Sequence, residues 1–193
     1  MPKTKKFNEL GILKKAIDLF WEKGFHATSI QDLVTHLGIN RASMYDTYGD
    51  KKALFEKAFQ HYRATNIQNI TTFFENQPTI KVAFERLFER AIEESCTDPN
   101  KKGCFVINTT TELIPGDKVI EEMVENNKKF FEDLFYQLLE KGVKNGEIST
   151  NKDLKSIARL FYMLFNGLKV TAKINPSKIE LQNSISIALQ LLD

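Results

Sequence analysis

Apolar residues recur at helical spacing through the first quarter of the chain. The pattern predicts a helix over about 7–23 that ends at Gly24, then two short helices over 28–37 and 41–48. Thr28, with Gln31 three residues later, has the form of a capping box, and Asn40 is a favoured N-cap residue. The apolar positions of the first two helices are Leu13, Ile17, Phe20, Trp21, Ile30, Leu33, Val34 and Leu37.

The same spacing continues to the end of the chain. After Asp50 a long helix is predicted to run to about residues 73–74, which would join the short helices to the rest of the protein. Further helices are predicted over about 79–96, 105–114, 119–143, 154–168 and 181–192, separated by turn-forming residues. The pattern therefore predicts an all-α fold.

Composition agrees with a folded globular protein. The chain has 193 residues, of which 42% are hydrophobic, and it contains no repeats or low-complexity runs. Its apolar runs are too short to span a membrane, and no apolar segment follows the basic N-terminus. Two cysteines, Cys96 and Cys104, do not make a disulfide framework. We expect a cytoplasmic protein with no membrane partner.

Charge is unevenly distributed. Residues 1–63 hold 11 Lys and Arg against 7 Asp and Glu, whereas the remainder holds 16 against 18. Lys3, Lys5 and Lys6 form a short basic arm, which is either a nucleic-acid contact or a solvated tail. A positive bias in the N-terminal part suits a nucleic-acid partner.

The two short helices are joined by a turn that contains Gly38, where a helix commonly ends in a left-handed residue. Helix, glycine turn and short helix is the layout of a helix-turn-helix, whose second helix enters the DNA major groove. Arg41 suits a guanine edge or a phosphate, and Tyr45, Thr47 and Lys51 are phosphate-contact types. An ordinary helical hairpin is the alternative interpretation.

The segment Gly38-Ile39-Asn40-Arg41-Ala42-Ser43-Met44-Tyr45, followed by Tyr48 and Lys51, resembles the DNA-binding segment of the tetracycline-repressor (TetR) family. The chain departs from the family pattern at Thr47, where His is usual, and at Tyr48, where Phe is commoner. The resemblance implies an N-terminal three-helix helix-turn-helix DNA-binding domain (1–62) and a helical-bundle ligand-binding and dimerisation domain (63–193). The expected DNA-binding residues are Thr28, Arg41, Ala42, Ser43, Tyr45, Thr47, Tyr48 and Lys51.

The resemblance also implies a mechanism. A homodimer would bind a palindromic double-stranded DNA operator as a repressor, and an unidentified small-molecule inducer would release it. In this family the last two helices pair with their copies, so the expected dimer interface is Ile157, Phe161, Leu164, Leu168, Leu181, Ile185, Leu189 and Leu192. The alternative is that these two helices close the monomer's own core. The expected ligand pocket is Phe88, Cys104, Phe105, Asn108, Glu112, Phe131, Tyr136, Tyr162 and Asn166. The alternative is a helical small-molecule-binding or scaffold protein whose head does not read DNA.

Catalytic chemistry finds little support in the residues. All three histidines lie in the first third of the chain, and there is no P-loop or dinucleotide fingerprint. We therefore expect no enzyme activity, no cofactor and no metal site. Cys104 follows two lysines near a predicted helix N-terminus, a setting that favours a thiolate, so it is a candidate sensor of oxidants or electrophiles. A buried, inert thiol is the alternative.

Overall fold

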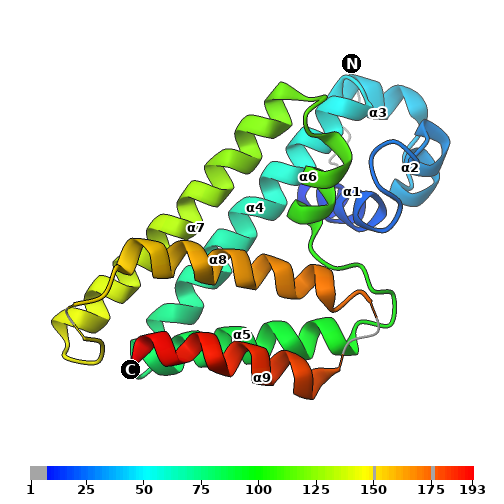
Figure 1. Cartoon of the computed structure of the whole chain (residues 1–193). Coiled ribbons are helices and arrows are strands. Elements are labelled where there is room, and N and C mark those ends of the chain that lie inside the picture. Colours follow the sequence, from blue (N-terminus) through cyan, green and yellow to red (C-terminus); the bar gives the residue numbers. More distant parts are fainter. Residues whose placement is uncertain (1–7, 150, 175–176) are drawn as a thin grey trace.

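In the computed structural model, which describes residues 8–149, 151–174 and 177–193, every regular element is a helix (Figure 1). This confirms the all-α prediction. Lys3, Lys5 and Lys6 lie outside the described residues. The helices are α1 (Glu9–Lys23), α2 (Ile30–Leu37), α3 (Arg41–Tyr48), α4 (Lys51–Glu75), α5 (Ile80–Thr97), α6 (Phe105–Leu113), α7 (Lys118–Lys144), α8 (Leu154–Thr171) and α9 (Lys178–Leu189), with a short 3₁₀ turn, η1 (Gln190–Leu192).

Helices α1 to α3 pack with the first half of α4 into a small unit, which we call the head (residues 8–62). Leu33, Met44 and Leu54 each have no exposed surface, so one residue from each of α2, α3 and α4 meets in the centre. Phe20 of α1 contacts Phe55 edge to face, with ring centroids 5.0 Å apart. The apolar stripes expected from the sequence therefore close a shared core.

Helix α4 is continuous over 25 residues and leads out of the head into the rest of the chain. Asp50 caps its first turn by accepting the Ala53 N–H at 2.7 Å. The predicted link between the two parts is confirmed. Figure 1 shows α4 running beside α7 from the head to the opposite end of the molecule.

The remaining helices form a bundle, which we call the body (residues 63–193). Its centre is phenylalanine-rich: Phe84 of α5 contacts Phe135 of α7 and Phe161 of α8, with centroids 5.3 and 5.0 Å apart. All three rings are fully buried. Helices α5, α8 and α9 lie in a layer across the lower half of α4 and α7 (Figure 1). None of the described helices is long and apolar enough to cross a membrane.

Helix α6 packs on α7 of the body and also contacts the head. Phe105, at its start, lies within 6.0 Å of the ring centroids of Trp21, Phe55, Phe59 and Tyr62. One apolar cluster thus contains residues of α1 to α4 together with residues of α6 and α7. The division proposed at residue 62 falls inside α4, and it stays a prediction.

Candidate nucleic-acid interface and cavity

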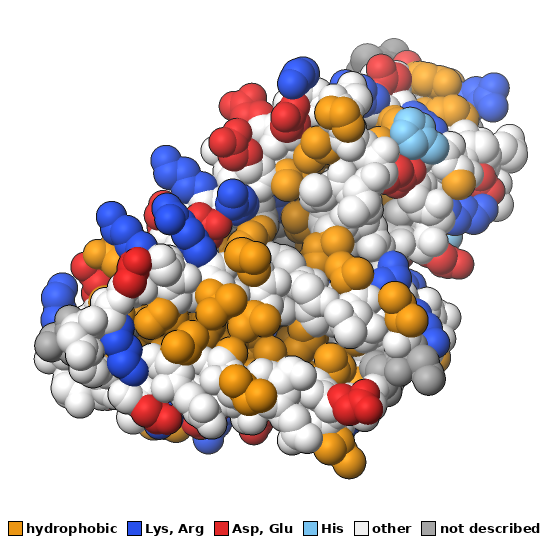
Figure 2. All heavy atoms as spheres, viewed as in Figure 1, with side chains coloured by type: hydrophobic (Ala, Val, Ile, Leu, Met, Phe, Trp, Pro, Cys, Tyr) orange, Lys and Arg blue, Asp and Glu red, His pale blue; other side chains and the backbone are white. Residues whose placement is uncertain are grey.

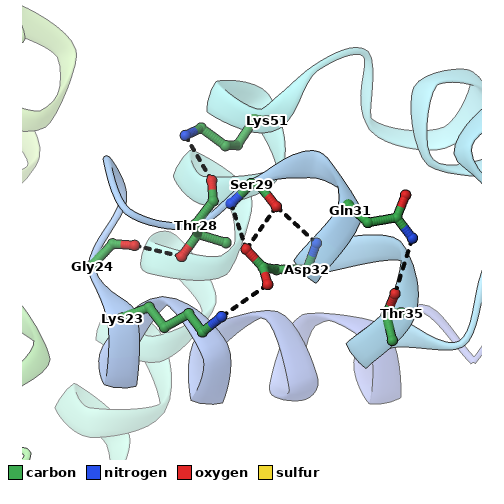
Figure 3. A network of polar contacts seen from close by, with 8 residues as sticks. All are labelled: Lys23, Gly24, Thr28, Ser29, Gln31, Asp32, Thr35 and Lys51. Atoms are coloured by element: carbon green, nitrogen blue, oxygen red, sulfur yellow. Dashed lines mark hydrogen bonds and ion pairs between the residues drawn. The ribbon is translucent and has the colours of Figure 1, made fainter.

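The first turn of α2 is capped one residue later than expected (Figure 3). Ser29 Oγ accepts the Asp32 N–H at 3.0 Å, and Asp32 Oδ2 accepts the Ser29 N–H at 2.9 Å. The predicted capping box of Thr28 and Gln31 is therefore wrong. Thr28 is turned away from the helix, because its hydroxyl donates to Gly24 O at 2.5 Å, and Gln31 donates to Thr35.

An ion pair ties this cap to α1. Lys23 Nζ lies 2.8 Å from Asp32 Oδ1 (Figure 3). The hydrogen bond from Lys23, and then those from Ser29, hold the pKa of the Asp32 carboxyl well below its usual range. The carboxylate also lies at the helix N-terminus, where negative charge is favoured. The start of α2 is consequently fixed to the end of α1.

The turn between α2 and α3 follows the sequence prediction. Gly38 has φ 69° and ψ 32°, the left-handed region, and its N–H donates to Val34 O at 3.1 Å. Asn40 Oδ1 then accepts the Ser43 N–H at 2.8 Å and starts α3. These two caps set the crossing of α2 and α3 in a helix-turn-helix arrangement.

Helix α3 presents a polar face to solvent. Arg41, Ala42, Tyr45 and Thr47 of the expected DNA-binding residues are exposed there. Asp46, which the sequence reasoning missed, is exposed on the same helix. A carboxylate there repels phosphates but accepts a hydrogen bond from a cytosine amino group. The exposed side chains of α3 thus include one cation, one anion and two hydroxyl groups.

Three other expected contact residues are enclosed by the head. Thr28, Ser43 and Tyr48 are 0%, 9% and 5% exposed. Burial raises the pKa of the Tyr48 hydroxyl. Their side chains shape the head from inside and have little surface to offer to DNA in this conformation.

Lys51 also has partners within the protein. Its Nζ donates to Phe25 O and Thr28 O, both at 2.9 Å, and it lies 4.4 Å from the centroid of the Phe25 ring. Figure 3 shows the Lys51 side chain at the start of α4 reaching back to the loop between α1 and α2. We expected a phosphate contact at Lys51; the structure gives its ammonium group two carbonyl partners instead.

Replacing Lys51 by methionine should therefore destabilise the head. The two carbonyls lose a charged donor, a loss of about 1–3 kcal/mol in the free energy of unfolding. Urea denaturation of the purified protein measures this, with the exposed Lys14→Met as the matched control. If Lys51→Met leaves the stability unchanged but weakens binding to all DNA sequences equally, Lys51 is instead a phosphate contact.

The same loop is held from the other side by α6. Glu112 Oε2 accepts the Phe25 N–H at 3.0 Å, and Oε1 accepts the His26 N–H at 2.7 Å. Gly24, with φ 83°, leaves room for this, because a Cβ there would lie 2.9 Å from the Glu112 carboxylate. Glu112 was expected in the ligand pocket; it clamps the head to the body instead, because its side of α6 faces the head.

A cavity of about 390 Å³ opens between the head and the body. Its wall is formed by Trp21, Tyr62, Asn66, Glu94, Ser95, Asp98, Asn100, Lys101, Lys102, Gly103, Cys104, Lys169, Ala172 and Lys173. Of the expected pocket residues only Cys104 is among them. Cys104 is 8% exposed and is the N-cap residue of α6. Burial, and then the neighbouring Cys104, raises the pKa of the Tyr62 hydroxyl.

A second, narrow space lies deeper in the body. Four of the expected pocket residues gather there: Cys104, Phe131, Tyr162 and Asn166. They are joined by Asn66, Val106, Asn127, Phe165 and Lys169, which the sequence reasoning missed. Its volume is about 10 Å³, close to the least that holds a single water molecule. Cys104, Asn66 and Lys169 line both spaces, so the cavity borders on the narrow space.

The other expected pocket residues line neither space. Phe88 and Phe105 are core residues, 0% and 1% exposed. Asn108 donates to Lys102 O at 2.9 Å, and the Tyr136 hydroxyl donates to Glu140 at 2.6 Å. Residue type and position in the sequence do not decide which face of a helix these residues and Glu112 occupy, and none of them borders either space.

The expected dimer residues face mainly inward. Ile157, Phe161, Leu168, Ile185 and Leu192 are buried in the subunit's own core, whereas Leu164, Leu181 and Leu189 are partly buried. The five buried side chains therefore have almost no surface for a second copy in this conformation. The exposed apolar residues of α8 and the C-terminal segment are Leu160, Met163, Val170, Ile174, Ile179, Ile187 and Leu191.

Two family sequence models match the chain. Residues 12–58 match the model for bacterial regulatory proteins of the tetR family, and residues 83–187 match the tetracyclin repressor-like C-terminal domain. YezE of Bacillus subtilis (strain 168), described as an uncharacterized HTH-type transcriptional regulator, is 33% identical over 195 residues, with 100% of both chains covered. The repressor ComR of Escherichia coli (strain K12) is 25% identical, covering 98% of this chain and 90% of ComR.

Solved structures show the same fold. The regulator CifR, in complex with a 26-bp operator DNA, superposes with a TM-score of 0.85 at 21% identity, covering 98% of this chain and 99% of CifR. The reduced form of Escherichia coli NemR superposes with a TM-score of 0.87 at 17% identity, covering 95% and 96% of the two chains. The likeness extends over both the head and the body.

Proposed function

The chain belongs to the tetR family of bacterial regulatory proteins and is a DNA-binding transcriptional regulator, and we propose that its dimer represses a promoter by occupying a palindromic operator. A small-molecule inducer binding the body then releases the DNA. Coupling of this kind is reciprocal, so the inducer binds the free dimer more tightly than the DNA-bound dimer. We propose that the protein works in the cytoplasm and has no catalytic role.

The proposal rests on the exposed side chains of α3 in a helix-turn-helix. The turn of this motif is fixed by the Gly38 C-cap of α2 and the Asn40 N-cap of α3. Arg41, Tyr45 and Thr47 are exposed on α3, with the Gly38 turn and the Asn40 cap fixing the helix beneath them. In such a motif the second helix lies in the major groove, and its first residues meet base edges. Arg41, the first residue of α3, is therefore our candidate base-reading residue.

Changing Arg41 to alanine should weaken operator binding by about 1–3 kcal/mol and relax specificity at one base position. Tyr45→Ala should weaken binding to all duplexes alike, since it removes a phosphate contact. The operator is first obtained by selecting genomic DNA fragments on the purified protein, and affinities are then compared by titration. Equal losses on operator and random DNA for Arg41→Ala would make Arg41 a phosphate contact.

We propose that the dimer forms through the outward stripe of α8 and α9. Figure 2 shows hydrophobic side chains gathered over α8 and along its boundary with α9. Met163, Ile174, Ile179 and Ile187 are each at least 66% exposed in the single subunit. An apolar surface of this kind marks an interaction site, and a two-fold dimer brings two heads to two half-sites.

The rival function is a ligand-binding or scaffold protein whose head does not read DNA. Salt-dependent binding to duplex DNA separates the two, because neutralised phosphates release counterions and affinity then falls steeply with salt. Binding to selected fragments that exceeds binding to random DNA supports the regulator. If the protein binds no duplex DNA even at low salt, the ligand-binding or scaffold function is favoured instead.

A further inference from the structure

The cavity between head and body is bounded by both parts of the chain. Trp21 comes from α1, Tyr62 and Asn66 from α4, Cys104 from the start of α6, and Lys169 from α8. Its volume of about 390 Å³ lies within the range of small-molecule sites. A molecule lodged there touches the head directly.

The cavity carries an excess of positive charge. Lys101, Lys102, Lys169 and Lys173 line it, and no ion pair involves any of them within the described residues. Lys169 and Lys102 are partly buried. Their contacts are with neutral groups: Lys169 Nζ lies 3.8 Å from the Phe165 ring centroid, and Lys173 Nζ lies 3.4 Å from Asn108 Oδ1.

The two carboxylates on the wall are already engaged. Glu94 is paired with Arg90 at 2.7 Å. Asp98 accepts the N–H groups of Asn100 and Lys102 within its own loop, at 3.0 and 2.6 Å. Neither carboxylate forms an ion pair with a lysine of the cavity wall in the described residues. An anion entering the cavity would supply a close counter-charge, in a partly desolvated place where charges interact more strongly than in water.

The inner wall offers neutral donors and aromatic surface. Trp21 Nε1 is buried and has no hydrogen-bond partner. The Trp21 and Tyr62 rings meet edge to face with centroids 5.3 Å apart. Cys104, the N-cap residue of α6, provides no side-chain cap. The uncapped start of α6 accommodates an acceptor group, and the Trp21 and Tyr62 rings accommodate an apolar one.

We propose that this cavity binds a small organic anion, a carboxylate with an aromatic or short apolar part, and that this anion is the inducer. The carboxylate lies among Lys102, Lys169 and Lys173, and the apolar part lies against Trp21 and Tyr62. The inducer role rests on the proposed function; the binding site does not. Because Trp21 belongs to the head and packs on Phe105, a ligand against it acts on the position of the head without a relay through the body.

The single tryptophan of the chain makes the test direct. Benzoate and hexanoate are titrated against the full-length protein and indole fluorescence is recorded, with benzamide and hexanamide as neutral molecules of the same shape. We expect a saturable change with a carboxylate and at least about tenfold weaker binding of its amide, since the amide lacks the charge. The binding should also weaken as salt is raised.

Two variants locate the site. Lys169→Gln with Lys173→Gln should weaken carboxylate binding by about tenfold or more. Lys14→Gln with Lys129→Gln removes the same charge from exposed positions outside the cavity and should leave binding unchanged. Equal responses to acid and amide, unaltered carboxylate binding by the Lys169/Lys173 variant, or no response to either carboxylate would overturn the proposal.

Operator binding is measured separately on the same samples. Release of operator DNA by the bound carboxylate supports the inducer role, whereas binding without release overturns that role and leaves the anion site standing. Failure to bind any DNA without ligand would reject the proposed function alone, because the fluorescence titration contains no DNA.

Discussion

The variant Glu112→Gln should loosen the head from the body. One carboxylate oxygen becomes an amide NH₂, which faces a backbone N–H of Phe25 or His26 instead of accepting from it. A hydrogen bond to a charged group is worth about 1.5–3 kcal/mol, and a donor left facing a donor adds to the loss. We expect the free energy of unfolding to fall by at least about 1.5 kcal/mol.

Amide hydrogen exchange gives the local reading of this change. The Phe25 and His26 amides should exchange about ten to a hundred times faster in the variant, because the opening that exposes them becomes easier. Glu122→Gln makes the same chemical change at an exposed position of α7 and should shift stability by less than about 0.5 kcal/mol. Unchanged protection of both amides would show that Glu112 does not hold the loop in solution.

Gly167→Lys should convert the dimer to folded monomers. A Cβ at Gly167 would meet no atom within 4 Å in the subunit, and the residue lies on the outward side of α8 with Leu160, Met163 and Val170. Lysine is also a better helix former than glycine, by about 0.5–1 kcal/mol. In the dimer the same side chain would place a charge in a closed apolar contact, which should raise the dissociation constant about a hundredfold or more.

Sedimentation velocity over a range of concentrations measures the dimer, and circular dichroism checks that the helices remain. Asn126→Lys adds the same charge at an exposed position of α7 and should keep the dimer intact. Operator affinity should fall with the dimer, since two linked heads bind far more tightly than one. A Gly167→Lys variant that remains dimeric would move the interface elsewhere.

Local chemistry made much of the head predictable. Gly38 and Asn40 decide the turn between α2 and α3 through their own backbone and side-chain preferences, so their roles follow from sequence. The start of α2 cannot be predicted from sequence in this way, because Thr28 and Ser29 are both favoured N-cap residues. The bond from Thr28 to Gly24 and the burial of Thr28 settle the choice, and the burial depends on how the whole head packs.

The partners of charged residues were beyond sequence reasoning. Glu112 binds an amide 86 residues earlier in the chain, and Lys51 binds a carbonyl 26 residues earlier. Periodicity also could not choose between the two apolar faces of α8. The stripe with Phe161 and Leu168 is buried in the subunit's own core, whereas Met163 and Val170 on the other face are exposed.

The length of α4 has a consequence for how finely DNA spacing can be sensed. At 1.5 Å per residue, its 25 residues span about 37 Å. A tilt of about 5° at the body end therefore displaces the far end by about 3 Å, close to the 3.4 Å rise of one base pair. A tilt of α4 by about 5° in the body is therefore enough to put the two heads of a dimer one base pair out of register with their half-sites.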